Sequence, residues 1–136
     1  MRETAGNSGV DRIFDAYQRA IYAKDVSAFM ALYSQDVRVF DAWECYCYED
    51  ADTWRAVIER WFNSLGKETV QVSIQEVRTV VSSDYASASA LVSYTAIAPD
   101  GGQLRSMKNR LSWVLACTHT GWKIVHEHTS VPINKS

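Results

Sequence analysis

The chain has 136 residues, with 14 Lys and Arg against 16 Asp and Glu and a formal net charge of −2. This length fits one domain with its own hydrophobic core, and the balanced charge argues against a nucleic-acid-binding protein, which usually has a basic face. No apolar run approaches the ~18 residues of a membrane span, and no secretory signal is evident. The three cysteines do not pair evenly, so we expect a cytoplasmic protein without a disulfide framework.

Two helices are predicted at the start of the chain, after a flexible N-terminus over residues 1–9. The apolar residues between 10 and 21 recur at three- and four-residue spacing, which is typical of an amphipathic helix. Asp25 can cap a second, short helix, and Tyr33 would lie on the apolar face of that helix.

A short strand and a third helix are predicted next. The strand reaches Asp41, and residues 43–48 either continue it or return beside it. The helix covers residues 53–65, with Asp50 or Asp52 as its N-terminal cap. Residues 41–52 contain five acids and no Lys or Arg, which indicates either a solvated loop or the acidic rim of a pocket.

After residue 66 the hydrophobic period changes from 3.6 to 2, which predicts strands. In the first of them the apolar phase slips at Gln75–Glu76, which indicates a β-bulge. Turn residues then separate three further strands, because Gly, Pro and Asp interrupt the alternation. These strands are predicted over residues 85–98, 104–118 and 122–131.

The element order predicts an α+β fold: a curved antiparallel sheet wrapped as a cone around the three N-terminal helices. We assign residues 10–132 to a single domain and residues 133–136 to a C-terminal tail. In the strand over 104–118 apolar residues fall on both faces. A homodimer through the outer face of the sheet is therefore expected.

Two regions resemble a known family. Residues 33–41, followed by the helix over 53–65, resemble the opening half of ketosteroid isomerase-like proteins. Residues 110–113 and 121–130 look like the closing hairpin of SnoaL-like domains, and also like the end of the calcium/calmodulin-dependent protein kinase II association domain. The chain is thus identified as similar to the SnoaL-like (nuclear transport factor 2-like) superfamily over residues 10–131. The resemblance implies a ketosteroid isomerase-like, or cystatin-like, roll, whereas superfamily functions range from isomerases, cyclases and dehydratases to oligomerising domains.

Asp41 is the best candidate for a catalytic base. It ends an apolar strand and is flanked by Phe40 and Trp43, where poor solvation would raise the pKa of its carboxyl. By resemblance, it takes the place of the carboxylate that shuttles a proton in ketosteroid isomerase. The alternative is a strand-end residue that bonds nearby backbone N–H groups.

Tyr17 lies on the apolar stripe of the first helix. If its hydroxyl points into the cone, it could donate a hydrogen bond to a developing oxyanion, and by resemblance it matches the tyrosine that does so in ketosteroid isomerase. The alternative is a core aromatic. Ketosteroid isomerase adds a second, protonated carboxyl group to its oxyanion hole from a late strand. The corresponding stretch here, residues 108–117, contains no Asp or Glu.

His126 and His128 are two residues apart on the last predicted strand, so we expect both imidazoles on one face. If that face is the inner one, His128 is a catalytic candidate and His126 a ligand-binding one; otherwise both are structural. A His-x-His pair can bind a metal with His119 as a third ligand, but no Cys or acid has a supporting spacing. We therefore predict no metal site.

Arg110 is a candidate anchor for an acidic group of a ligand, because it is a charged residue inside an apolar strand. A three-residue turn would pair Arg110 with Ser130, whereas a two-residue turn at Thr120–Gly121 would place it opposite Val131. The family resemblance favours an inward arginine. The alternative is a solvated residue at the end of the strand.

The many aromatic residues, five Trp, seven Tyr and four Phe, indicate large side chains that line either a core or a cavity, and for a cavity we expect a small apolar or aromatic ligand. The candidate ligand-binding aromatics are Tyr33, Trp43, Trp54 and Trp61. No phosphate loop or Ser-His-Asp signature is present, so no cofactor is expected. Two hypotheses follow: a cofactor-independent isomerase, cyclase or dehydratase that moves a proton, or a non-catalytic ligand-binding or oligomerisation domain. A cavity beside Asp41 and a raised pKa favour the first.

Overall fold

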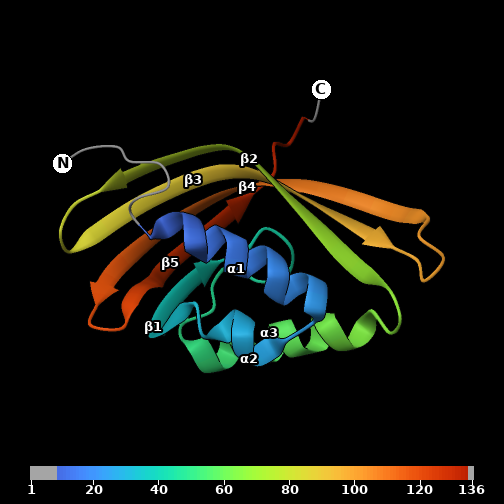
Figure 1. Cartoon of the computed structure of the whole chain (residues 1–136), viewed down its shortest axis with the longest axis horizontal. Helices are drawn as coiled ribbons and strands as arrows, with labels where there is room; N and C mark the ends of the chain where they lie inside the picture. Colours follow the sequence, from blue (N-terminus) through green and yellow to red (C-terminus); the bar gives the residue numbers. More distant parts are fainter. Residues whose placement is uncertain (1–8, 135–136) are drawn as a thin grey trace.

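The computed structural model describes residues 9–134 and has an α+β fold, with three helices packed against one face of a curved sheet (Figure 1). The predicted fold class is therefore confirmed. The expected flexible N-terminus lies outside the described residues except for Gly9, as do the last two residues of the expected tail. The helices are α1 (Val10–Ala23), α2 (Val26–Met30) and α3 (Ala51–Ser64). The strands are β1 (Tyr33–Phe40), β2 (Thr69–Val81), β3 (Tyr85–Ile97), β4 (Gln103–Thr118) and β5 (Gly121–Ser130).

The five strands form one sheet in the order β1-β5-β4-β3-β2. Strand β1 runs parallel to β5, and the other neighbours are antiparallel. The sheet bends over the helices, so that its concave face lies against them (Figure 1). This arrangement places the ends of β1 and β5 and the inner faces of β3 and β4 around α1 and α3.

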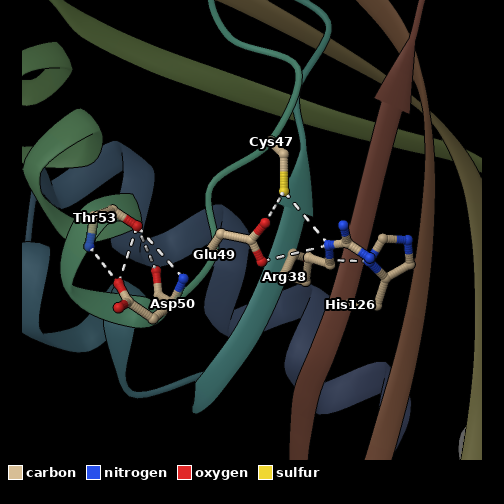
Figure 2. Close-up of polar contacts among 6 residues, drawn as sticks. All are labelled: Arg38, Cys47, Glu49, Asp50, Thr53 and His126. Atoms are coloured by element: carbon tan, nitrogen blue, oxygen red, sulfur yellow. Dashed lines mark hydrogen bonds and ion pairs between the residues drawn. The ribbon is translucent and has the colours of Figure 1, made fainter.

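The two predicted helix caps that can be checked are present. The Asp25 side chain accepts a hydrogen bond from the backbone N–H of Ala28 and begins α2. Of the two candidates for α3, Asp50 is the cap: its carboxylate accepts from the Thr53 N–H at 2.9 Å, and the Thr53 hydroxyl accepts from the Asp50 N–H (Figure 2). This reciprocal arrangement satisfies donors that the first turn of a helix leaves free.

The prediction that Tyr33 belongs to the second helix is wrong. Helix α2 ends at Met30, and Tyr33 begins β1 opposite Ile124 of β5. Its ring is buried and tilted against Phe29 of α2. Tyr33 therefore contacts the core from the sheet side, where its hydroxyl reaches a buried acid.

The predicted bulge in β2 is confirmed, since the pairing with β3 shifts between Gln75 and Arg78 and Glu76 has a positive φ of 58°. A second bulge lies in the last hairpin. Thr118 pairs with Gly121, so the turn has two residues. Further along, Leu115 pairs with Ile124 but Val114 pairs with His126, so Val125 is an extra residue of β5. Such an extra residue reverses which side chains face inward beyond it.

Candidate functional site

A cavity of about 370 Å³ opens between α3, the loop after β1 and the concave face of the sheet. This volume is within the range of small-molecule sites. Aromatic rings form much of its wall: Tyr17, Phe29, Trp43, Trp54, Trp61 and Tyr94. Polar side chains also line it: Asp41, Glu44, Arg60, Asn109, Glu127 and Thr129.

The structure brings five of the nine predicted site residues to this cavity, namely Asp41, Tyr17, Trp43, Trp54 and Trp61. A sixth, Tyr33, lies behind the wall. Its hydroxyl donates a hydrogen bond of 2.5 Å to Oε1 of Glu127, so it acts on the cavity through that acid.

Glu127 is the acid that sequence reasoning missed. It lies on β5 with only 2% of its surface exposed, and its Oε1 accepts hydrogen bonds from Tyr33 and, at 2.9 Å, from the indole N–H of Trp113. Burial raises the pKa of Glu127 to about 7, although the two hydrogen bonds work in the opposite direction, and the charge of Asp41 raises it further. Near neutral pH the carboxyl group of Glu127 therefore exists in both protonation states.

Asp41 is half-buried just after β1, and the Thr129 hydroxyl donates a weak hydrogen bond of 3.4 Å to its Oδ1. Burial raises the pKa of Asp41, whereas hydrogen bonds from the backbone of Trp43 and from Thr129 lower it in part. The cavity and the direction of this pKa are those expected of a catalytic base. The backbone bonds, which the alternative invoked, are also present.

Tyr17 and Tyr94 face each other across the cavity wall, with their hydroxyl oxygens 2.7 Å apart. Burial raises the pKa of both phenols, so both stay neutral at physiological pH. Asn109 interacts with the Tyr94 hydroxyl and lowers its pKa in part. Two hydroxyls that share one hydrogen bond leave one O–H proton for a further acceptor.

Two buried polar atoms of the cavity wall, Asn109 Oδ1 and Trp54 Nε1, have no hydrogen-bond partner among the described residues. The Trp54 indole lies close enough to the Tyr33 hydroxyl to lower its pKa. Asn109 is only 3% exposed. Because a buried acceptor without a partner is costly, Asn109 Oδ1 is a candidate contact for a bound molecule.

The prediction that Arg110, His126 and His128 face the cavity is wrong. Arg110 does pair with Ser130, but both lie on the outer face, where Nε of the exposed Arg110 donates to the Ser130 hydroxyl at 3.0 Å. His128 is exposed on the same face. Arg110 faces outward because it alternates with the buried Asn109 and Leu111 along β4. His128 faces outward because of the bulge at Val125, which turns Glu127 and Thr129 inward instead.

His126 contacts the outer side of β1, where its Nδ1 donates to the Arg38 carbonyl oxygen at 2.8 Å (Figure 2). Figure 2 also shows Arg38 beside Cys47 and Glu49, with Arg38 Nε 3.4 Å from the Cys47 sulfur and 3.6 Å from Glu49 Oε1. None of these four residues lines the cavity. Within residues 9–134, no group of three or more His, Cys, Asp or Glu side chains could hold a metal ion, and no helix is long and apolar enough to cross a membrane.

Several solved structures share this fold. An NTF2-like protein of unknown function from Pseudomonas putida KT2440 has a TM-score of 0.81 at 18% identity, covering 95% of this chain and 88% of that one. A suggested calcium/calmodulin-dependent protein kinase II association domain from Xanthomonas campestris has a TM-score of 0.78 at 14% identity, with 98% and 96% covered. A suggested dehydratase of the NTF2-like family from Streptomyces avermitilis has a TM-score of 0.78 at 15% identity, with 92% and 94% covered.

Identities this low establish the fold and no more. No protein with a curated function matches the sequence. The model of the SnoaL-like domain family matches residues 10–134, nearly the whole chain. Together with the helix-filled curved sheet, this match shows that the chain belongs to the SnoaL-like family.

Proposed function

We propose that this protein is a cofactor-independent enzyme that moves a proton on a small, largely apolar or aromatic molecule held in the cavity. The observation that carries the proposal is the presence of two carboxyl groups, Asp41 and Glu127, in one aromatic cavity. Their environments differ: Asp41 is half-buried and accepts backbone hydrogen bonds, whereas Glu127 is fully enclosed. Two carboxyl groups in such different environments can differ in pKa, so that one acts as the base and the other as the acid.

Asp41 would remove a proton from a carbon next to a carbonyl, because it is the carboxyl nearer to solvent and keeps its charge more easily. Protonated Glu127 would donate to the carbonyl oxygen as negative charge develops there. The Tyr17–Tyr94 hydroxyl pair can supply a further donor. The surrounding residues shield the Glu127 carboxyl from solvent, which strengthens its interaction with a bound molecule.

The proposal is tested by hydrogen–deuterium exchange of 2-tetralone and 2-indanone, two small aromatic ketones, in D₂O. Proton NMR would follow the loss of signal from the protons on the carbon atoms next to the carbonyl group. We expect the protein to accelerate exchange, and we expect Asp41→Asn and Glu127→Gln to lower the rate about 100-fold or more each. Asp36→Asn is the matched control, because Asp36 is exposed on β1 away from the cavity. Exchange at the buffer rate, or equal rates in all variants, would contradict the proposal.

The second candidate is a non-catalytic oligomerisation domain, which the similarity to the suggested kinase association domain supports. Val80 and Val114 lie in one row of the outer sheet face and are 39% and 38% exposed. A homodimer through this face would cover them. Light scattering tests it: we expect a dimer that Val114→Lys converts to a monomer, and a wild-type monomer would exclude this interface.

A further inference from the structure

The cavity wall leaves one buried acceptor and one buried donor without partners among the described residues, Asn109 Oδ1 and Trp54 Nε1. Glu127 Oε1 already accepts two hydrogen bonds, but no bond to its Oε2 occurs among the described residues. Asp41 accepts a hydrogen bond of 3.4 Å from Thr129 and backbone hydrogen bonds from Trp43 and Glu44, but no charged donor binds it among the described residues. A molecule that satisfies these acceptors brings N–H or O–H donors of its own, and an acceptor elsewhere on it can bind the Trp54 N–H.

The charged side chains of the cavity wall carry a net negative charge, which also favours a ligand with N–H donors. Within residues 9–134, Arg60 is the sole basic side chain that lines the cavity, and its Nη2 is held by Glu44 Oε1 at 2.9 Å. Neither Asp41 nor Glu127 has an ion-pair partner among these residues. With Arg60 neutralised by Glu44, a bound molecule meets net negative charge.

The aromatic rings favour the same kind of ligand. Trp43 and Trp61 line the cavity together with Trp54, and the faces of indole rings attract cations more strongly than those of other aromatics. Carboxylates beside such rings make a site in which an ammonium group exchanges its water for charged acceptors and ring faces. An anionic ligand would instead face Asp41 and Glu127 with like charge.

We propose that the molecule bound in this cavity is a protonated amine on an apolar or aromatic body, and that Glu44 sets this preference by neutralising Arg60. The inference rests on the proposed function and names the substrate class of the same site. The ammonium group donates to Asn109 Oδ1 and is attracted by the negative charge of the wall, which leaves Asp41 free to act on the carbon next to the carbonyl.

Binding by three probes that share one phenylpropyl body tests this charge preference: 3-phenylpropan-1-amine, 3-phenylpropan-1-ol and 3-phenylpropanoate. Quenching of tryptophan fluorescence reports binding, because three tryptophans line the cavity. At neutral pH and low salt we expect the amine to bind about 10-fold more tightly than the alcohol, and the carboxylate to bind most weakly. Equal affinity of amine and alcohol would overturn the amine proposal.

The role of Glu44 is tested with Glu44→Gln, which keeps the side-chain size and frees Arg60. We expect amine affinity to fall and carboxylate affinity to rise, each about 3-fold, since both partners of the pair are partly solvated. Glu49→Gln is the matched control, because Glu49 pairs with Arg38 outside the cavity. Unchanged affinities in Glu44→Gln, or the same change in the control, would overturn the role of Glu44.

The pH dependence gives a second readout. Glu127 faces Tyr33 of β1, Tyr17 of α1, Tyr94 of β3 and Asp41, and the tyrosines stay neutral because burial raises their pKa values. A primary amine stays cationic until about pH 10. Amine affinity should therefore rise between about pH 5.5 and 8.5 as Glu127 ionises, and the rise should be smaller in Glu127→Gln. A flat profile would overturn the attraction between ionised Glu127 and the ammonium group.

The failures of the two proposals are distinguishable. If ketone exchange depends on Asp41 and Glu127 but none of the three probes discriminates by charge, only the amine inference falls. If no probe binds and no ketone exchanges, the small-molecule function falls with it.

Discussion

Replacing Glu127 with glutamine is expected to remove most of the loss of stability that the protein undergoes between acid and neutral pH. Glutamine has the size of a protonated glutamate, and its carbonyl oxygen can accept the same hydrogen bonds from Tyr33 and Trp113. The variant should therefore resemble the wild type at low pH. At higher pH the wild type must hold a buried charge, and the variant need not.

The magnitude follows from the pKa of Glu127, which burial raises from 4.5 to about 7. Because the folded state holds this proton more tightly than the unfolded chain, the stability contributed by protonation is complete below pH ~4.5 and is lost as the pH rises through 7. At about 1.4 kcal/mol for each tenfold change in proton affinity, the loss is about 3 kcal/mol. The enclosed position of Glu127 leaves solvent little opportunity to screen it.

Urea unfolding followed by tryptophan fluorescence measures this difference at pH 4.5 and pH 8 (about two and a half units below and one unit above the Glu127 pKa). We expect wild type and Glu127→Gln to have similar free energies of unfolding at the lower pH. At the higher pH the variant should be more stable by about 3 kcal/mol. Curves that stay parallel across the whole range would refute the burial argument.

Three further predictions follow from single contacts. Tyr33→Phe removes a donor to Glu127, so the Glu127 pKa should rise further, which ¹³C NMR titration of the labelled carboxyl would detect; no change would mean that this hydrogen bond is absent in solution. Glu76→Gly should stabilise the protein by about 1 kcal/mol in thermal unfolding, because glycine tolerates the positive φ at the β2 bulge, and destabilisation would show that the Glu76 side chain matters more. Arg110→Ala and His128→Ala should leave ketone exchange unchanged, since both side chains lie on the outer face, and a large loss in either would contradict that placement.

Much of the fold could be predicted because local signals agreed with one another. The stripe of α1, the Asp25 and Asp50 caps and the phase slip before Val77 each correspond to an observed element. Strands β3, β4 and β5 fall within one residue of their predicted ends. Tyr33 was misplaced because α2 is short, and an aromatic residue one turn beyond a short helix has the same spacing as one inside it.

The candidate site could be predicted only where residues flank a long apolar element. Asp41 and Trp54 belong to the end of β1 and the stripe of α3, and both reach the cavity. Asn109 gave no signal, since an amide inside a long strand has no characteristic spacing. Glu127 gave no signal either, since it lies between two histidines, and strict alternation from Ile124 would place it on the outer face.

A carboxyl group faces the cavity where the sequence predicts two imidazoles, because β5 contains one extra residue. Ile124 is buried opposite Leu115, and strict alternation from Ile124 would send His126 and His128 inward. Val125 instead forms a bulge, so the inward positions pass to Glu127 and Thr129. The adjacent β-branched residues Ile124 and Val125 are the only local trace of it, because each would otherwise prefer a buried face. The chemistry of this cavity is therefore set by the register of a single hairpin.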